Sequence, residues 1–305
     1  MKKVLVIGSL NMDIAVETKC LPAVGETVLG KGYTYSPGGK GANQAFTIGR
    51  LKGEVTMLGC VGGDDFGRTL IESLAAEGVE TKYIRRLEDK TTGTAFILTD
   101  SKANNSIITI AGANESCDIS YIREHEKLIE ECDYLLLQME IPLEAVYYAI
   151  EKAKEYQKTV ILNPAPAPDN IPAEILRKID VITPNETELR TLTQKNIASK
   201  SEVIEGANAL IALGVGNVVV TIGKEGAVWV HPDGYEYFYG KEVLAVDTTG
   251  AGDCFNGTLV MGLAEKLSFG EAIQNANTVA ALSVTKKGAQ ASIPDMEEVR
   301  NFIKI

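Results

Sequence analysis

The sequence predicts an α/β protein with a mainly parallel central sheet and a small second β-sheet. From residue 118 onward, helical patterns alternate with short apolar segments, as in the βαβ units of a parallel sheet. Two stretches break this alternation, because residues 24–36 and 94–110 carry glycine, threonine and tyrosine in a β-like spacing. With 305 residues, of which 45% are hydrophobic, the chain can bury a large core.

The elements of the α/β body follow from the apolar spacing. An apolar run at residues 2–8 predicts the first strand, and a glycine turn leads into a helix over residues 42–51. Four apolar residues from Phe255 to Leu263 have helical spacing, so a helix is expected to begin near Gly252. Four further strands are predicted at residues 134–138, 159–162, 181–183 and 218–222, and two final helices at residues 270–284 and 296–303.

The two β-like stretches predict a separate small antiparallel sheet. Because each stretch is followed by a return to the helical pattern, we expect a discontinuous lid inserted into the α/β body. The body is assigned to residues 1–10, 42–92 and 112–305, and the lid to residues 11–41 and 93–111. Such a lid could close over a substrate.

The composition indicates a small-molecule partner inside the cell. A formal net charge of −11 and a pI near 4.9 argue against a nucleic-acid partner and against an anionic membrane. The chain starts without the apolar segment of a signal peptide, and no apolar run is long enough to span a bilayer. The five cysteines are scattered and odd in number, which favours reduced thiols over a disulfide framework. We therefore expect a cytoplasmic protein.

Residues 246–257 form the most informative segment. Gly250 and Gly252 let the backbone turn its N–H groups toward one point at the predicted helix start, and such a start favours anions. Asp253 would repel a bound phosphate, so its carboxylate makes most sense as a base that takes a proton from an attacking hydroxyl. The alternative is an ordinary helix N-terminus with Asp253 as a partner of the helix dipole. Local features alone leave both interpretations open.

A second glycine turn, at residues 36–45, precedes a predicted helix. It would let the backbone approach a ligand, with Lys40 and Asn43 as donors, although a plain tight turn is the alternative. Residues 25–32 almost match a P-loop, but Gly32 replaces the required Ser or Thr and no apolar strand leads into the segment. We therefore reject a P-loop. The sequence also lacks a G-x-G-x-x-G dinucleotide fingerprint, which disfavours hydride transfer.

Three further segments place polar groups after predicted strands. Asn11 and Asp13 follow the first strand, where open α/β sheets bind ligands, and would suit neighbouring hydroxyls; an Asx turn is the alternative. Asn185 and Glu188 lie on one helical face and suit a hydrated Mg²⁺ near phosphates, the alternative being a helix cap. Residues 221–226 form a third strand-to-glycine loop, or only a hairpin turn.

Taken together, seven segments occur in a recognisable order: residues 11–13, 38–45, 138–142, 163–167, 183–188, 247–257 and 286–294. In this order the chain resembles the ribokinase-like carbohydrate kinase family over essentially its whole length. The resemblance implies a three-layer αβα ribokinase-like fold with a mainly parallel central sheet and a small β-sheet lid. It also favours phosphoryl transfer over an ordinary helix start at Asp253.

The resemblance implies roles for individual residues. Asp253 is the implied catalytic base, with Gly250, Ala251 and Gly252 as a backbone anion hole. The implied sugar contacts are Asn11, Asp13, Gly39, Lys40, Asn43, Glu140 and Asp253. The implied nucleotide contacts are Asn185, Thr221, Gly223, Lys224, Gly226, Gly252 and Asn277. The implied monovalent-cation loop comprises Asp247, Thr249, Ser283, Lys286, Gly288 and Ser292, and Glu188 would lie near Mg²⁺.

The implied activity is the ATP-dependent phosphorylation of D-ribose at O5 to ribose 5-phosphate, with Mg²⁺, a K⁺-like activator and a homodimer formed through the lid. A kinase for deoxyribose, for another small sugar or for a nucleoside would keep the same catalytic loop. The polar sugar set favours a small free polyol over a nucleoside, which would need an apolar or stacking base pocket. A non-catalytic sugar-sensing protein on the same fold is the alternative from another class.

Overall fold

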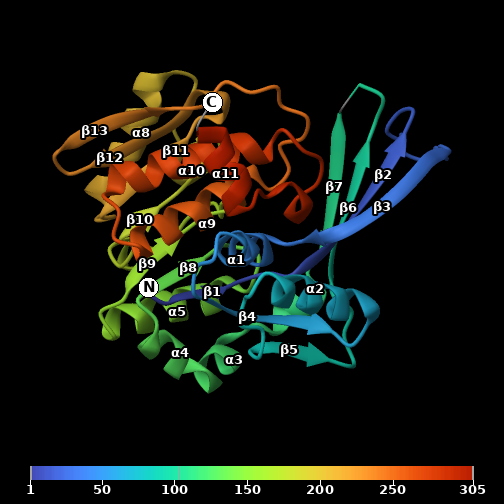
Figure 1. Ribbon diagram of the computed structural model, residues 1–305, viewed down its shortest axis with the longest axis horizontal. Coiled ribbons are helices and arrows are strands. Elements are labelled where there is room, and N and C mark those ends of the chain that lie inside the picture. The colour runs from blue at the N-terminus through green and yellow to red at the C-terminus, as the bar shows by residue number, and fades with distance from the viewer. Residues whose placement is uncertain (1, 103, 304–305) are drawn as a thin grey trace.

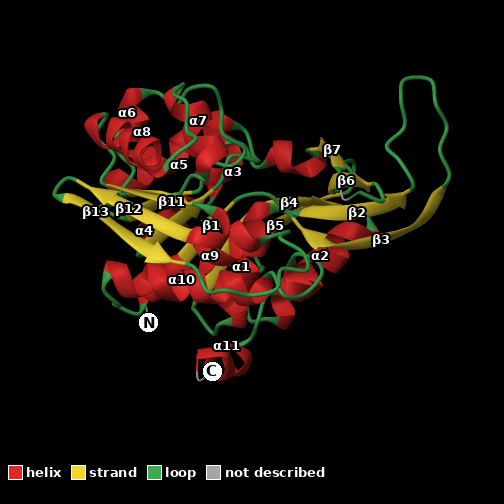
Figure 2. Ribbon diagram, turned by 90° about the horizontal axis from the view of Figure 1, so that it is seen from above, coloured by secondary structure: helices red, strands yellow, loops and turns green. Residues whose placement is uncertain are grey.

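The computed structural model describes residues 2–102 and 104–303 (Figure 1). It contains two sheets, one of nine strands and one of four. Helices cover both faces of the larger sheet, which gives three layers in the order αβα, and the smaller sheet projects from one end of the molecule (Figures 1 and 2). The predicted α/β class, with a large mainly parallel sheet and a small second sheet, is confirmed.

The large sheet has the strand order β13-β12-β11-β10-β9-β8-β1-β4-β5. Its strands are β1 (Val4–Ile7), β4 (Val55–Gly62), β5 (Ile84–Leu87), β8 (Tyr134–Leu137), β9 (Thr159–Leu162), β10 (Val181–Ile182), β11 (Asn217–Thr221), β12 (Gly226–His231) and β13 (Gly234–Tyr239). All neighbouring pairs are parallel except β11–β12 and β12–β13. The carboxyl ends of the central strands therefore meet at one edge of the sheet, where open α/β sheets bind ligands.

Each face of the large sheet packs against its own set of helices (Figure 2). One face carries α1 (Lys40–Arg50), α2 (Asp65–Ala76), α9 (Ala251–Ala264), α10 (Phe269–Ser283) and α11 (Met296–Ile303). The other carries α3 (Ile119–Glu124), α4 (Glu126–Glu131), α5 (Leu143–Glu155), α6 (Ala173–Leu176), α7 (Glu186–Thr193) and α8 (Lys200–Ala212). Strand β1 shows why both layers form: Leu5 and Ile7 join one apolar core, whereas Val4 and Val6 join the other.

Three short 3₁₀ helices complete the main body. They are η1 (Gly112–Ser116), η2 (Gly223–Glu225) and η3 (Gln290–Ser292). The η2 turn joins the antiparallel strands β11 and β12. Of the two alternatives for residues 221–226, a ligand loop or a hairpin turn, the structure shows a hairpin turn, and this turn also has a place in the site described below. No helix in residues 2–102 and 104–303 combines the length and the apolar character needed to cross a membrane.

The small sheet has the strand order β3-β2-β6-β7. Its strands are β2 (Asn11–Thr18), β3 (Gly30–Gly38), β6 (Gly93–Thr99) and β7 (Asn105–Ile110). The predicted antiparallel arrangement is wrong at its centre, because β2 and β6 pair in parallel. Strand spacing in a sequence does not encode the direction of a partner, and the long excursion through α1 and α2 returns the chain in the same direction. Strand β2 also lies outside the two stretches that the β-like spacing identified.

Candidate active site

Polar side chains gather where α1 and α9 begin, next to the carboxyl ends of the central strands. Figure 1 shows α1 and α9 side by side, and the two helices are in contact. Ser9 follows β1, Glu140 follows β8 and Asn163 follows β9. This is the edge at which a parallel sheet offers strand-end side chains to a ligand.

Asp253 lies in the first turn of α9 and is almost completely buried, with 7% of its surface exposed. The turn is possible because Gly250, the N-cap, has a φ of 75°, which favours glycine. The Asp253 carboxylate accepts hydrogen bonds from Asn43 Nδ2 and Gln44 Nε2, each at 2.9 Å. Burial raises the pKa of this carboxyl group, while Lys40 and the two amide donors oppose the rise. A carboxylate with these properties is suited to accept a proton.

Several charged groups act on one another around Asp253. Burial favours the neutral form of the Lys40 ammonium, but the carboxylates of Asp253, Glu140, Glu188 and Asp13 outweigh it and raise the pKa of Lys40. Burial, together with Glu140 and Asp253, raises the pKa of Asp13 to about 7. Burial also raises the pKa of Glu188. Four carboxylates thus surround one ammonium group, which suits a ligand with hydroxyl donors or a bound cation.

Hydrogen bonds from three neighbours orient Asn11 and Glu140. Asn114 Nδ2 donates to Asn11 Oδ1 at 2.7 Å, so the Asn11 amide presents its NH₂ group as a donor. Glu140 Oε2 accepts from the Ser9 hydroxyl at 2.5 Å and from the backbone N–H of Lys40 at 3.1 Å. The predicted sugar-contacting residues therefore lie together, with Gly39 at the N-cap of α1.

A cleft of about 870 Å³ adjoins this cluster on the other side of the α9 start. All seven predicted nucleotide-contacting residues line it: Asn185, Thr221, Gly223, Lys224, Gly226, Gly252 and Asn277. A Cβ atom at Gly223 or Gly252 would meet nothing within 4 Å, so both backbones face open space. Ala251, assigned to the anion hole, lines the cleft as well; the sequence did not identify other lining residues such as the apolar Val243, Phe255 and Val284.

The first turn of α9 contributes to both parts of the site: Ala251 and Gly252 line the cleft, and Asp253 is bonded to Asn43 and Gln44. The Ala251 N–H donates to the Thr248 carbonyl oxygen at 3.2 Å. The N–H groups of Gly252 and Asp253 have no acceptor among residues 2–102 and 104–303. Free N–H groups at a helix start can bind an anionic oxygen. Of the three predicted anion-hole residues, Ala251 and Gly252 line the cleft.

Asn185 and Glu188 form the capping box of α7. Asn185 Oδ1 accepts from the Glu188 N–H at 2.8 Å, and Glu188 Oε2 accepts from the Asn185 N–H at 2.9 Å. The other Glu188 oxygen and the Asn185 NH₂ group have no hydrogen-bond partner among residues 2–102 and 104–303, so both are left for a ligand. In the described part of the chain, no three His, Cys, Asp or Glu side chains are grouped to hold a bare metal ion. A magnesium ion here would need oxygens from water and phosphate.

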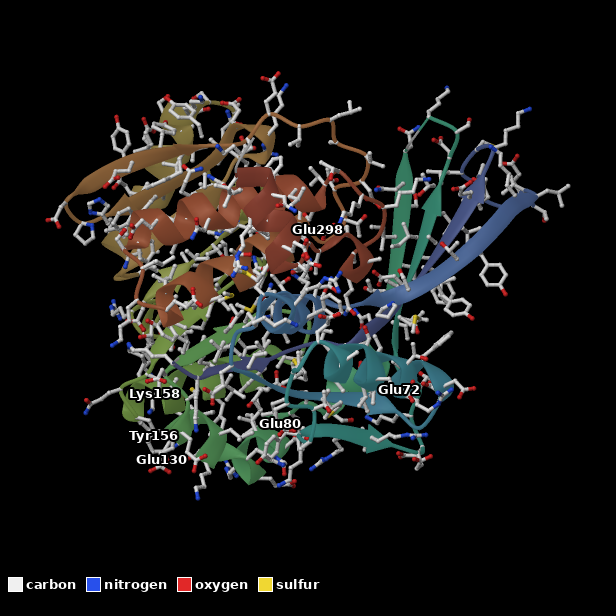
Figure 3. The ribbon with its side chains drawn as sticks, in the orientation of Figure 1. Glu72, Glu80, Glu130, Tyr156, Lys158 and Glu298 are labelled. Carbon is white, nitrogen blue, oxygen red and sulfur yellow. The ribbon has the colours of Figure 1, made fainter. Side chains whose placement is uncertain are left out.

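The predicted cation-loop residues lie where the segment before α9 meets the segment after α10. Asp247 accepts from the N–H and hydroxyl of Thr249 and from the N–H of Gly288 at 2.9 Å. Burial would raise the pKa of Asp247, but these hydrogen bonds lower it, so the group stays ionised. Ser283 and Ser292 are buried, and their hydroxyls donate to backbone carbonyls. Lys286 forms an ion pair with Glu298 of α11, labelled in Figure 3.

Sequence reasoning missed several residues of this site. Gln44 and Gln138 are completely buried and belong to the hydrogen-bond network around Asp253, and Asn114 is 1% exposed. Gln138 and Asn163 each follow a buried strand directly. Polar residues at strand ends were the signal that could have identified both.

Comparisons with known proteins agree with this geometry. Residues 1–296 match the family described as pfkB family carbohydrate kinase. The chain is 40% identical to a ribokinase of Haemophilus influenzae and 35% identical to a deoxyribokinase of Salmonella typhi, with 99% of each chain covered in both cases. It also superposes on the structure of Arabidopsis thaliana ribokinase complexed with ribose and ATP, with a TM-score of 0.93, 32% identity, and 100% and 99% of the two chains covered.

The raised pKa of Asp13 predicts a pH-dependent cost to stability. Between the unfolded value near 3.8 and the folded value of about 7, the unfolded chain loses this proton and the folded protein keeps it, so stability falls as the pH rises. Asp13→Asn should therefore raise the free energy of unfolding at pH 8 by on the order of 2–4 kcal/mol. The gain should shrink as the pH falls from about 7 toward 4.

Urea denaturation of the ligand-free protein at several pH values measures this effect. Asp65→Asn is the matched control, because the Asp65 side chain is 89% exposed. A gain for Asp13→Asn that does not change with pH would show that Asp13 titrates normally.

Proposed function

Because the chain belongs to the pfkB family of carbohydrate kinases, we propose that it transfers the γ-phosphoryl group of ATP to O5 of D-ribose. One observation carries the proposal: a buried carboxylate, Asp253, lies at a helix start between a polar cluster and a cleft of about 870 Å³. The cluster suits a sugar and the cleft suits a nucleotide. The helix start between them is where a phosphoryl group would be transferred.

In this proposal Asp253 is the base. Its carboxylate takes the proton of the sugar's primary hydroxyl as that oxygen attacks the γ-phosphorus. Asn43 and Gln44 hold the carboxylate oxygens in place. The anion hole at residues 250–252 stabilises the charge on the transferred group, and Gly252, whose N–H has no acceptor among the described residues, lines the cleft.

Asn11, Asp13, Asn43 and Glu140 bind the sugar hydroxyls, with Gly39 and Lys40 at the start of α1. The lid, residues 11–41 and 93–111, covers this sugar site. The acidic cluster also suits Mg²⁺ near Glu188, which would neutralise charge on the ATP phosphates when bound. Turnover that persists in excess chelator would contradict a magnesium requirement.

Ribose is favoured over other acceptors because the cluster is polar and the relative bound to ribose has the same fold. Deoxyribose is the second candidate, since deoxyribokinases match 99% of this chain at 35% identity. A sugar-sensing protein without activity would bind ribose but would not consume ATP.

A panel of acceptors tests the function. The protein should phosphorylate ribose with a higher kcat/KM than deoxyribose, fructose or adenosine, and Asp253→Asn should lower kcat by roughly 10²–10⁴. Ribose binding, measured by calorimetry, should be nearly intact in Asp253→Asn, because the base acts mainly in the transition state.

Asp65→Asn serves as the matched carboxylate control and should keep the wild-type kcat, since this side chain is 89% exposed. Preference for another acceptor would overturn the ribose assignment. Near-normal kcat in Asp253→Asn would remove Asp253 from the role of base.

We further propose a homodimer formed through the small sheet. The strand register places Tyr35, Ile14, Phe96 and Ile108 in one cross-strand row, on the face opposite Asp13. On this face Tyr33, Tyr35, Ile108 and Ile110 are 70%, 60%, 61% and 48% exposed, and exposed apolar groups of this kind mark interaction surfaces. Sedimentation equilibrium at the mass of a single chain would contradict a dimer.

The five free cysteines are consistent with a reducing compartment. We accordingly propose a cytoplasmic location, which cell fractionation tests.

A monovalent cation is the last part of the proposal. The Asp247 carboxylate and the backbone oxygens of the loop formed by residues 247–249 and 283–292 would hold it, and the ion would order the chain just before the α9 start. Thr249, Ser283, Lys286, Gly288 and Ser292 would contribute mainly through their backbone, because the Lys286 ammonium is paired with Glu298.

Activity should therefore rise when K⁺ replaces Na⁺ or a bulky organic cation at fixed Mg²⁺ and fixed ionic strength. The larger ion is better matched to a loose ring of carbonyl oxygens. Asp247→Ala should reduce this response and leave the base in place, whereas Asp65→Ala should respond like the wild type. Equal rates of ribose phosphorylation in all three salts would show that the loop does not bind an activating cation.

A further inference from the structure

We propose that Gln44 is the positioning residue of the catalytic base. Its side chain fixes the Asp253 carboxylate and keeps it able to accept a proton. The inference rests on the proposed role of Asp253 and extends it to a residue that contacts neither the cleft nor, in our proposal, the sugar. Gln44 lies on α1, one residue after Asn43, and its side chain is completely buried.

The hydrogen bonds of Gln44 allow only one orientation of its amide. Its NH₂ group donates to Asp253 Oδ1 at 2.9 Å and to Asn163 Oδ1 at 3.1 Å. A carboxylate can only accept, so the nitrogen must face Asp253. The remaining atom, Gln44 Oε1, accepts from Gln138 Nε2 at 2.6 Å. All the hydrogen-bonding groups of this amide are used except one lone pair on its oxygen.

The partners of Gln44 are fixed in the same way. Asn163 Nδ2 donates to the Thr183 carbonyl oxygen at 3.1 Å, and because a carbonyl only accepts, the Asn163 oxygen must face Gln44. Asn163 follows β9 and Thr183 follows β10. The chain of amides therefore connects the ends of adjacent strands to the base on α9.

Gln138, at the end of β8, is held by the close approach of β1. A Cβ atom at Gly8 would lie 2.0 Å from Gln138 Oε1, so only glycine leaves room for this amide. The side chain is completely buried, and its oxygen has no hydrogen-bond partner in the part of the chain that the structure describes. Such packing leaves the Gln138 amide little freedom to turn away from Gln44.

The charged groups around Asp253 make its pKa sensitive to the hydrogen bond from Gln44. The groups that act on Asp253 are Lys40 on α1, which favours its charged form, and Glu140 after β8, which opposes it. Asp13 on β2 and Glu188 on α7 belong to the same interacting set. In a buried site with more carboxylates than ammonium groups, removing one of two donors raises the carboxyl pKa. It also lets the carboxylate rotate.

The test compares Gln44→Met, which keeps length and volume, with Gln138→Met and with Thr258→Val as control. Thr258 is buried on the same helix as the base, and its hydroxyl donates to the Cys254 carbonyl oxygen at 2.8 Å. Gln44→Met should lower kcat by roughly 10- to 100-fold with little change in the KM for ribose. The acidic limb of its kcat profile should move about one unit to higher pH.

Gln138→Met should shift the pH profile in the same direction by a smaller amount. In this variant the Gln44 NH₂ group still donates to Asp253, and only the hydrogen bond from Gln138 to the Gln44 oxygen is lost. Thr258→Val should keep the wild-type profile. A merely structural role would lower kcat at every pH without moving the limb. Thermal unfolding shows whether Gln44→Met folds. If it does not, the pH profile of Gln138→Met tests the inference: a shifted acidic limb supports it, and an unchanged limb contradicts it.

A second readout does not depend on turnover. Carboxyl ¹³C NMR of protein labelled at aspartate should show a higher pKa for Asp253 in Gln44→Met than in the wild type. An unchanged Asp253 pKa, or an unchanged pH profile in an active Gln44→Met enzyme, would overturn the inference. Failure of the proposed function gives a different result from failure of the Gln44 inference. If the proposed function is wrong, the wild type phosphorylates no sugar, but the NMR comparison still shows whether Gln44 changes the pKa of Asp253.

Discussion

A carboxylate that is buried at a helix start needs hydrogen-bond donors from the protein, and Asp253 receives them from α1. The two helices must therefore pack closely. A Cβ atom at Gly257 of α9 would lie 2.8 Å from the Gln44 carbonyl oxygen, and one at Gly41 of α1 would lie 2.7 Å from the backbone after β1. Glycine at these two positions lets α1 sit between β1 and α9, so the position of the base depends on backbone contacts as well as on polar side chains.

The same geometry explains why the site is electrostatically unfavourable in the absence of ligands. Asp13, Glu140, Glu188 and Asp253 surround the Lys40 ammonium, and burial raises the pKa values of Asp13, Glu188 and Asp253. Sugar hydroxyls and cations would relieve this excess of negative charge when they bind. A site whose charges repel one another until a ligand binds is typical of an enzyme that trades stability for function.

The sequence predicted the class of the fold because burial leaves a clear periodicity. Apolar runs at Tyr134–Leu137, Thr159–Leu162 and Val181–Ile182 lie in the centre of the parallel sheet, and the glycine turns before α1 and α9 mark the two helix starts. The parallel pairing of β2 with β6 was not predictable, because strand direction depends on the route of the chain through α1 and α2. The roles of Gln44 and Asn114 could not be predicted, because their hydrogen-bond partners lie 94 to 209 residues away in the chain. For Gln138 the position directly after a buried strand was a signal, but it does not name the partner. Asn43 and Asp253, in contrast, stand beside glycine turns, and this local signal let the sequence single them out as site candidates.

The central claim is that Asp253 faces the sugar hydroxyl that attacks ATP. A crystal structure of the protein with ribose and a non-hydrolysable ATP analogue tests it most directly. The account predicts that the primary hydroxyl oxygen of ribose lies about 2.6–3.2 Å from an Asp253 carboxylate oxygen, with the γ-phosphate over the start of α9. A ribose molecule bound with no hydroxyl in hydrogen-bond reach of Asp253, and with this carboxylate bonded only to Asn43 and Gln44, would contradict the account.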